Sequence, residues 1–106
     1  MPNGADKNWV RLCGALDGFY MRYGRWPTRV RVFPASLADL RERLLSPGAL
    51  AMVESKLQLV ADEASMVAED DEGRSYDYGQ EGFPPQRPAP RAAEWLGVEP
   101  NREDGH

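Results

Sequence analysis

The chain of 106 residues has little of the chemistry on which most enzymes and metal proteins depend. It holds one cysteine, Cys13, and one histidine, His106, at the last position. A single cysteine excludes an internal disulfide and fits a reducing compartment, and the usual Cys/His spacings of zinc sites are absent. A histidine at a chain end is poorly placed for acid–base catalysis. We therefore expect a protein that is not an enzyme and that takes no cofactor and no metal.

Long apolar runs are also missing. No stretch approaches the roughly 20 apolar residues of a membrane span, and the first residues lack the apolar centre of a secretory signal. These absences predict a cytoplasmic protein with no membrane partner. The hydrophobic content of 42% and aromatic content of 9% are typical of a folded chain, and the length fits one domain.

The charge that is present is divided unevenly along the chain. Residues 1–50 hold eight Lys/Arg and four Asp/Glu, a net charge of +4. Residues 51–106 hold five and thirteen, a net charge of −8. A chain with one basic and one acidic half presents surfaces suited to binding partners.

The first half of the chain predicts one strand among helices. Apolar residues at three- and four-residue steps predict a helix over 7–23, which Gly24 is expected to end in a left-handed conformation. Valine and arginine alternate over 29–33 and predict a short strand. Ser36, followed by Asp39, predicts a capping box at the start of a second helix.

The second half predicts a third helix and further strands. Ser46 and the proline after it indicate a helix start, with the helix running to about residue 56. Residues 57–61 predict a strand, and 66–69 with 74–78 predict a hairpin in which Gly73 supplies a positive φ. The expected fold class is α+β, a two-layer structure with a small mixed β-sheet and helices on one face, in the order αβααββ. The first two strands pair in parallel through a right-handed crossover, and the later strands follow as an antiparallel meander.

The domain organisation follows from where this patterning stops. We expect a flexible N-terminus over 1–6, a single α+β domain over 7–79, a Pro-rich strap with a short helical turn over 80–97, and a disordered tail over 98–106. Phe83 and Trp95 are expected to anchor the strap across the sheet face that the helices leave open. The Pro-x-x-Pro spacing of Pro85 and Pro88 allows a second interpretation, a ligand for an SH3-type domain.

One candidate binding surface lies on the first helix, on the side opposite its aromatic residues. It carries basic side chains and two glycines, which cost about 1 kcal/mol each in a helix interior and so suggest close approach of another backbone. The leading hypothesis is a non-catalytic interaction module that binds a protein partner through this basic, glycine-containing helix face. A second copy of the chain is another candidate partner. The predicted partner-binding residues are Lys7, Arg11, Gly14, Gly18 and Arg22.

A second candidate surface follows that helix. Arginines interleaved with aromatic residues combine phosphate neutralisation with base stacking. The alternative hypothesis is therefore a nucleic-acid-binding accessory domain, against which stands an acidic pI of about 5.0. Its predicted contact residues are Arg25, Trp26, Arg29 and Arg31.

Two further features have structural interpretations. The acidic loop 69–72 lacks the ligand spacing of a calcium loop, so we expect a solvated turn; a metal or the basic groove of a partner remain alternative ligands for it. Cys13 lies among the apolar residues of the first helix and is expected to be a buried side chain rather than a nucleophile.

Overall fold

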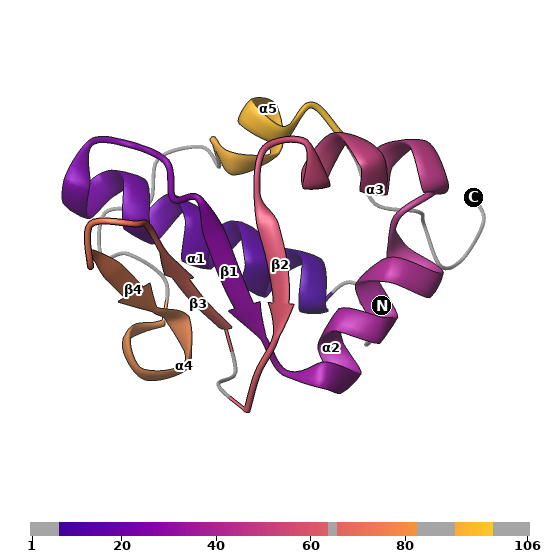
Figure 1. Cartoon of the computed structure of the whole chain (residues 1–106), viewed down its shortest axis with the longest axis horizontal. Coiled ribbons are helices and arrows are strands. Elements are labelled where there is room, and N and C mark those ends of the chain that lie inside the picture. Colours follow the sequence, from indigo (N-terminus) through magenta and orange to yellow (C-terminus); the bar gives the residue numbers. More distant parts are fainter. Residues whose placement is uncertain (1–6, 64–65, 83–90, 99–106) are drawn as a thin grey trace.

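The fold is that of a computed structural model, which describes residues 7–63, 66–82 and 91–98. Within these ranges it contains five α-helices, one π-helical turn and a four-stranded mixed sheet. Helix α1 (Lys7–Tyr23) crosses behind the sheet in Figure 1, and the helix α5 (Ala92–Leu96) lies at its upper end. The α+β class with a mixed sheet, expected from the sequence, is confirmed.

Helix α1 has the predicted bounds because its apolar spacing and its stop signal agree. The side chains of Leu12, Leu16 and Phe19 are fully buried in the core. Gly24 ends the helix with φ +74°, and its N–H donates to the carbonyl of Tyr20 at 2.7 Å. Glycine is the residue best able to adopt this left-handed conformation.

The sheet has the order β2-β1-β3-β4, which differs from the expected meander. Strand β1 (Arg29–Val32) pairs in parallel with β2 (Gln58–Ala61), as predicted. On its other side, however, β1 pairs antiparallel with β3 (Met66–Glu69), which then pairs with β4 (Ser75–Asp77). The expected meander of β2, β3 and β4 is therefore wrong, because β3 pairs with β1 and not with β2, whereas the predicted hairpin of β3 and β4 is confirmed. The three strands that follow the helices lie where they were predicted, and the order αβααββ leaves one of them out.

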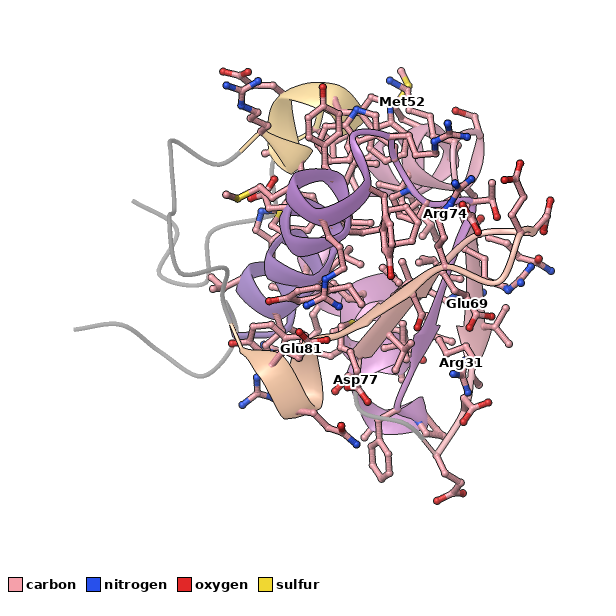
Figure 2. The ribbon with its side chains drawn as sticks, turned by 90° about the vertical axis from the view of Figure 1, so that its left-hand side faces the viewer. Arg31, Met52, Glu69, Arg74, Asp77 and Glu81 are labelled. Carbon is pink, nitrogen blue, oxygen red and sulfur yellow. The ribbon has the colours of Figure 1, made fainter. Side chains whose placement is uncertain are left out.

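The two faces of β1 explain why β3 lies beside it. On the buried face, Val30 and Val32 lie opposite the inward-facing Ala68 and Met66. On the open face, the two arginines of β1 lie near Glu69 of β3, and Figure 2 shows Arg31 and Glu69 on the side of the sheet away from α1. With β3 beside it, β1 buries its valines on one face and pairs its arginines with an acid on the other.

The crossover from β1 to β2 is helical throughout. It consists of α2 (Pro34–Asp39), the π-helical turn η2 (Leu40–Leu44) and α3 (Pro47–Glu54). Ser46 caps α3 as predicted, since its hydroxyl oxygen accepts from the N–H of Ala49 at 3.1 Å. The predicted capping box at Ser36 is wrong: α2 begins two residues earlier, and Phe33 is its N-cap residue without a side-chain cap.

Two short helices follow the sheet in the described part of the chain. The turn α4 (Tyr78–Glu81), which the sequence did not predict, follows β4, whereas α5 confirms the predicted C-terminal helical turn. Trp95 of α5 does not cross the open sheet face; it stacks on Trp26 with ring centroids 4.7 Å apart. That correction follows from the docking of α5 on α1, where Asp17 accepts from the N–H of Ala92 at 2.9 Å. Phe83, Pro85, Pro88, the N-terminus 1–6 and most of the tail lie outside the described residues.

None of the described helices has the length and apolar character that crossing a membrane requires.

Candidate interaction groove

A groove lies at the end of the sheet where β1 and β4 terminate. Both strands are antiparallel to β3, so they run in the same direction and their C-terminal ends meet at one edge. Figure 1 shows α2 and α4 following these strands at the lower end of the sheet. The groove has a volume of about 380 Å³ and is lined by Arg11, Phe33, Ser36, Tyr78 and Gly79.

Local sequence explains why two aromatic residues line this groove. Phe33 lies between the last residue of β1 and Pro34, which opens α2, so its side chain leaves the sheet and is 43% exposed. Tyr78 follows β4 directly, begins α4 and is half-buried. Arg11 faces them from α1, with its side chain exposed.

The charge of Arg11 has no carboxylate partner within the described part of the chain. Two acids on the neighbouring elements are already bound. Asp39 of α2 accepts from Asn8 at 2.8 Å and from Arg43 at 2.6 Å, and Glu81 of α4 accepts from Arg22 at 2.9 Å. Arg11 is therefore a cation without an ion pair among the described residues, and it lines the groove together with two aromatic side chains.

The glycines of the predicted helix face lie elsewhere than expected. Gly14 and Gly18 are both buried, so the expectation that they form an exposed docking surface is wrong. At Gly18 the reason is direct: a β-carbon would lie 2.4 Å from two ring atoms of Tyr76 in β4. The predicted approach of another backbone is therefore wrong at Gly18, where the group that approaches is the side-chain ring of Tyr76 of the same chain.

Arg22, another basic residue of that face, is paired within the chain. Arg22 forms two hydrogen bonds with Glu81, and its guanidinium carbon lies 4.9 Å from the centre of the Tyr76 ring. The hydrogen bond between the two side chains is the main cause of both pKa shifts: it raises the pKa of Arg22 and lowers the pKa of Glu81. Lys7 is the first residue of α1, and its side chain lies outside the described part.

The arginines of the predicted nucleic-acid surface are paired with acids. Arg29 donates to Glu69 at 2.5 Å and to Asp71 at 3.2 Å. Arg31 donates to the second oxygen of Glu69 at 3.2 Å and lies 3.6 Å from Asp62. These contacts neutralise the open sheet face, which leaves little positive charge there to attract phosphates.

Trp26, the aromatic residue of the predicted nucleic-acid surface, packs against other rings of the protein. Trp26 lies between Trp95 and Tyr20, whose ring centre is 4.4 Å from its own. The ammonium group of Lys56 lies over the ring of Trp95 and donates a hydrogen bond to the backbone carbonyl of Trp95. Arg25 is exposed and forms no ion pair with a described residue, so it is a lone cation.

The acidic loop is a hydrogen-bonded turn. One oxygen of Asp70 accepts from the N–H groups of Glu72 and Arg74 at 2.9 and 3.1 Å, and the other accepts from the Arg74 side chain at 2.8 Å. Burial opposes ionisation of Asp70, yet these hydrogen bonds together hold its pKa below the ordinary value. Gly73 has φ +87°, as predicted. No cluster that could hold a metal occurs among the described Asp, Glu, His and Cys residues.

Cys13 is buried as expected. Burial, with a smaller contribution from Asp17, raises the pKa of its thiol to about 12. A thiol with so high a pKa is not a nucleophile at neutral pH.

Comparison with family models, with curated proteins and with solved structures found no match for this chain.

The groove combines one predicted residue with four that the sequence reasoning did not select. Arg11 belonged to the predicted basic helix face, whereas Phe33, Ser36, Tyr78 and Gly79 join it only through the fold. The one available signal was Phe33, a large aromatic residue between a strand and a proline, where no regular element buries it.

Proposed function

We propose that this protein is a non-catalytic interaction module that binds a protein partner through the groove lined by Arg11, Phe33 and Tyr78. The observation that carries the proposal is Arg11, which forms no ion pair with a described residue and lines the groove together with two aromatic side chains. Most other described arginines are held by acids: Arg22, Arg29, Arg31, Arg41, Arg43 and Arg74. Among the described side chains of the basic helix face inferred from the sequence, Arg11 is thus the cation that forms no ion pair with another described residue.

The composition of the groove supports a protein ligand. Arginine and aromatic side chains are the residues that most often dominate the free energy of protein–protein binding. An exposed phenylalanine ring also gains from being covered, since each Å² of apolar surface removed from water contributes about 25 cal/mol.

A photo-crosslinking experiment tests this proposal at the residue level. The photoreactive residue p-benzoylphenylalanine replaces Phe33 in one variant and Met52 in a matched control. Met52 is 44% exposed in α3, and Figure 2 shows it at the opposite end of the molecule from Glu81 of α4. We expect a specific crosslinked protein from the Phe33 position alone, and its loss when Arg11→Glu is added.

A charge-matched control separates the groove from general electrostatics. Arg25→Glu makes the same change of charge at another exposed arginine without an ion pair in the described part. We expect Arg25→Glu to leave the crosslink intact. Equal crosslinks from positions 33 and 52, or an unchanged crosslink in Arg11→Glu, would rule out the groove as the binding surface.

A further inference from the structure

The ligand of this groove can be specified further by its chemistry. We infer that it is a short acidic peptide segment in which one carboxylate side chain lies next to an aromatic or large aliphatic side chain. This inference rests on the proposed function of the Arg11 groove and names the class of partner that the groove selects.

The carboxylate is required by the state of Arg11. A guanidinium presents a planar set of N–H donors that matches a carboxylate in a bidentate geometry. Two acids on the elements beside the groove are occupied, because Asp39 is bound by Asn8 and Arg43 and Glu81 by Arg22. A carboxylate from outside the chain would meet Arg11 without displacing an existing pair.

The apolar neighbour is required by the rings on the other wall. Phe33 is 43% exposed and Tyr78 half-buried, and both line the groove with Arg11. An aromatic or aliphatic side chain placed against them removes apolar surface from water and makes the offset or edge-to-face ring contacts that aromatic pairs prefer. Ser36 adds a hydroxyl group at the same wall, able to donate to or accept from a peptide group.

The described lining of the groove holds one cation, which favours a carboxylate over more highly charged ligands. Phosphate groups and nucleic-acid backbones are bound by several cations together, but Arg22, the next arginine along α1, is held by Glu81. The chain also carries a formal net charge of −4, which repels a polyanion at long range. A volume of about 380 Å³ lies near the lower end of the range of ligand pockets, about 300–1,000 Å³, and fits a short segment.

Two-dimensional NMR of the ¹⁵N-labelled protein tests this inference with defined probes. The first peptide is acetyl-Gly-Gly-Phe-Glu-Gly-Gly-amide, and matched peptides replace Glu by Gln or Phe by Gly. We expect saturable shifts at the amides of Arg11, Phe33, Ser36 and Gly79 with the first peptide. Each matched peptide should bind about fivefold to tenfold more weakly, the loss expected for one charge-assisted contact or one buried ring.

Variants assign the preference to its residue. In Arg11→Gln, the Glu and Gln peptides should bind equally, whereas Arg25→Gln should keep the preference for Glu. Sodium acetate and inorganic phosphate serve as probes of simple anion binding and should produce no saturable shifts at Phe33.

Several results would overturn the inference. These are the absence of shifts at the groove with every peptide, equal binding of the Glu and Gln peptides by the native protein, and acetate or phosphate shifts that match those of the first peptide. The photo-crosslinking experiment remains independent of these outcomes. A crosslink that depends on Arg11, together with no preference for acidic peptides, would reject the ligand class and retain the proposed function.

Discussion

Replacing Gly18 by alanine should destabilise the fold, although the same change stabilises most helices. An alanine β-carbon would lie 2.4 Å from Cε1 and Cζ of Tyr76 and 2.7 Å from Cδ1. Carbon atoms in contact are ordinarily about 3.5–4.0 Å apart, so the ring would have to retreat by about 1 Å. The ring is held in place, because its hydroxyl donates to the carbonyl of Gly82 at 2.6 Å and β4 is paired with β3.

The expected magnitude combines three contributions to the free energy of unfolding. Overpacking costs about 1–3 kcal/mol. Loss of the tyrosine hydrogen bond costs about 1 kcal/mol. The higher helix propensity of alanine stabilises the fold by about 1 kcal/mol relative to a mid-helix glycine. We therefore expect Gly18→Ala to lower stability by about 1–3 kcal/mol, which is a fall in Tm of at least about 4 °C for a domain of this size.

Urea denaturation followed by tryptophan fluorescence measures this change, and a second background gives it a sign test. Tyr76→Val removes the three ring atoms that clash while keeping a residue suited to a strand. In that background Gly18→Ala should stabilise by up to about 1 kcal/mol, so its effect changes sign. Gly48→Ala in α3, where nothing lies within 4 Å of the added β-carbon, should stabilise in either background. A higher urea midpoint for Gly18→Ala than for the native protein, with Tyr76 present, would refute the conclusion that the Tyr76 ring leaves no room for a β-carbon at Gly18.

Three other measurements test the contacts around this core. Asp17→Ala removes the acceptor of two N–H groups at the start of α5, at 3.1 and 2.9 Å. The free energy of unfolding should therefore fall by about 1–2 kcal/mol, and the near-ultraviolet circular dichroism of the tryptophan stack should be lost. The stability of Asp17→Asn should lie between that of the native protein and that of Asp17→Ala. The pKa of Asp70 is lowered in the folded state, so its ionised carboxylate contributes stability above the unfolded pKa near 3.8, and this contribution is lost as pH falls through the folded pKa. Urea midpoints measured from pH 7 to pH 2 should therefore depend less on acid in Asp70→Asn than in the native protein. Cys13, with a pKa raised to about 12 by burial, should react with a disulfide reagent at pH 8 only in urea, and rapid labelling of the native protein would contradict its burial.

Local signals in the sequence were sufficient for several elements. The bounds of α1, the left-handed Gly24 and the serine cap at Ser46 were all predicted correctly. Each depends on residues within one or two turns of the chain, where backbone sterics and nearby hydrogen bonds decide the conformation. Ser36 shows the limit of such signals, since Pro34 is equally suited to a first helical turn and determines the start of α2.

Contacts between distant residues could not be derived in the same way. Periodicity correctly placed Gly18 opposite the aromatic stripe of α1, but it did not show that Tyr76 of β4 covers this second side. A helix that packs between a sheet and further elements has more than one buried face, and the sequence of the helix alone does not reveal it. The pairing of Arg29 and Arg31 with Glu69 was equally hidden, because it depends on β3 lying next to β1.

The candidate groove depends on the same strand order. In the expected meander, β1 and β4 would be separated by two strands, or about 14 Å at the usual spacing of 4.7–4.9 Å. In the observed order β2-β1-β3-β4, one strand separates them and the distance is about 10 Å. Phe33 and Tyr78, which follow these two strands directly, are thereby brought to one groove with Arg11. The proposed binding surface therefore arises from the step that local sequence does not determine, the insertion of β3 beside β1. This is why Arg11 was selected from the sequence as a candidate while its aromatic neighbours were not.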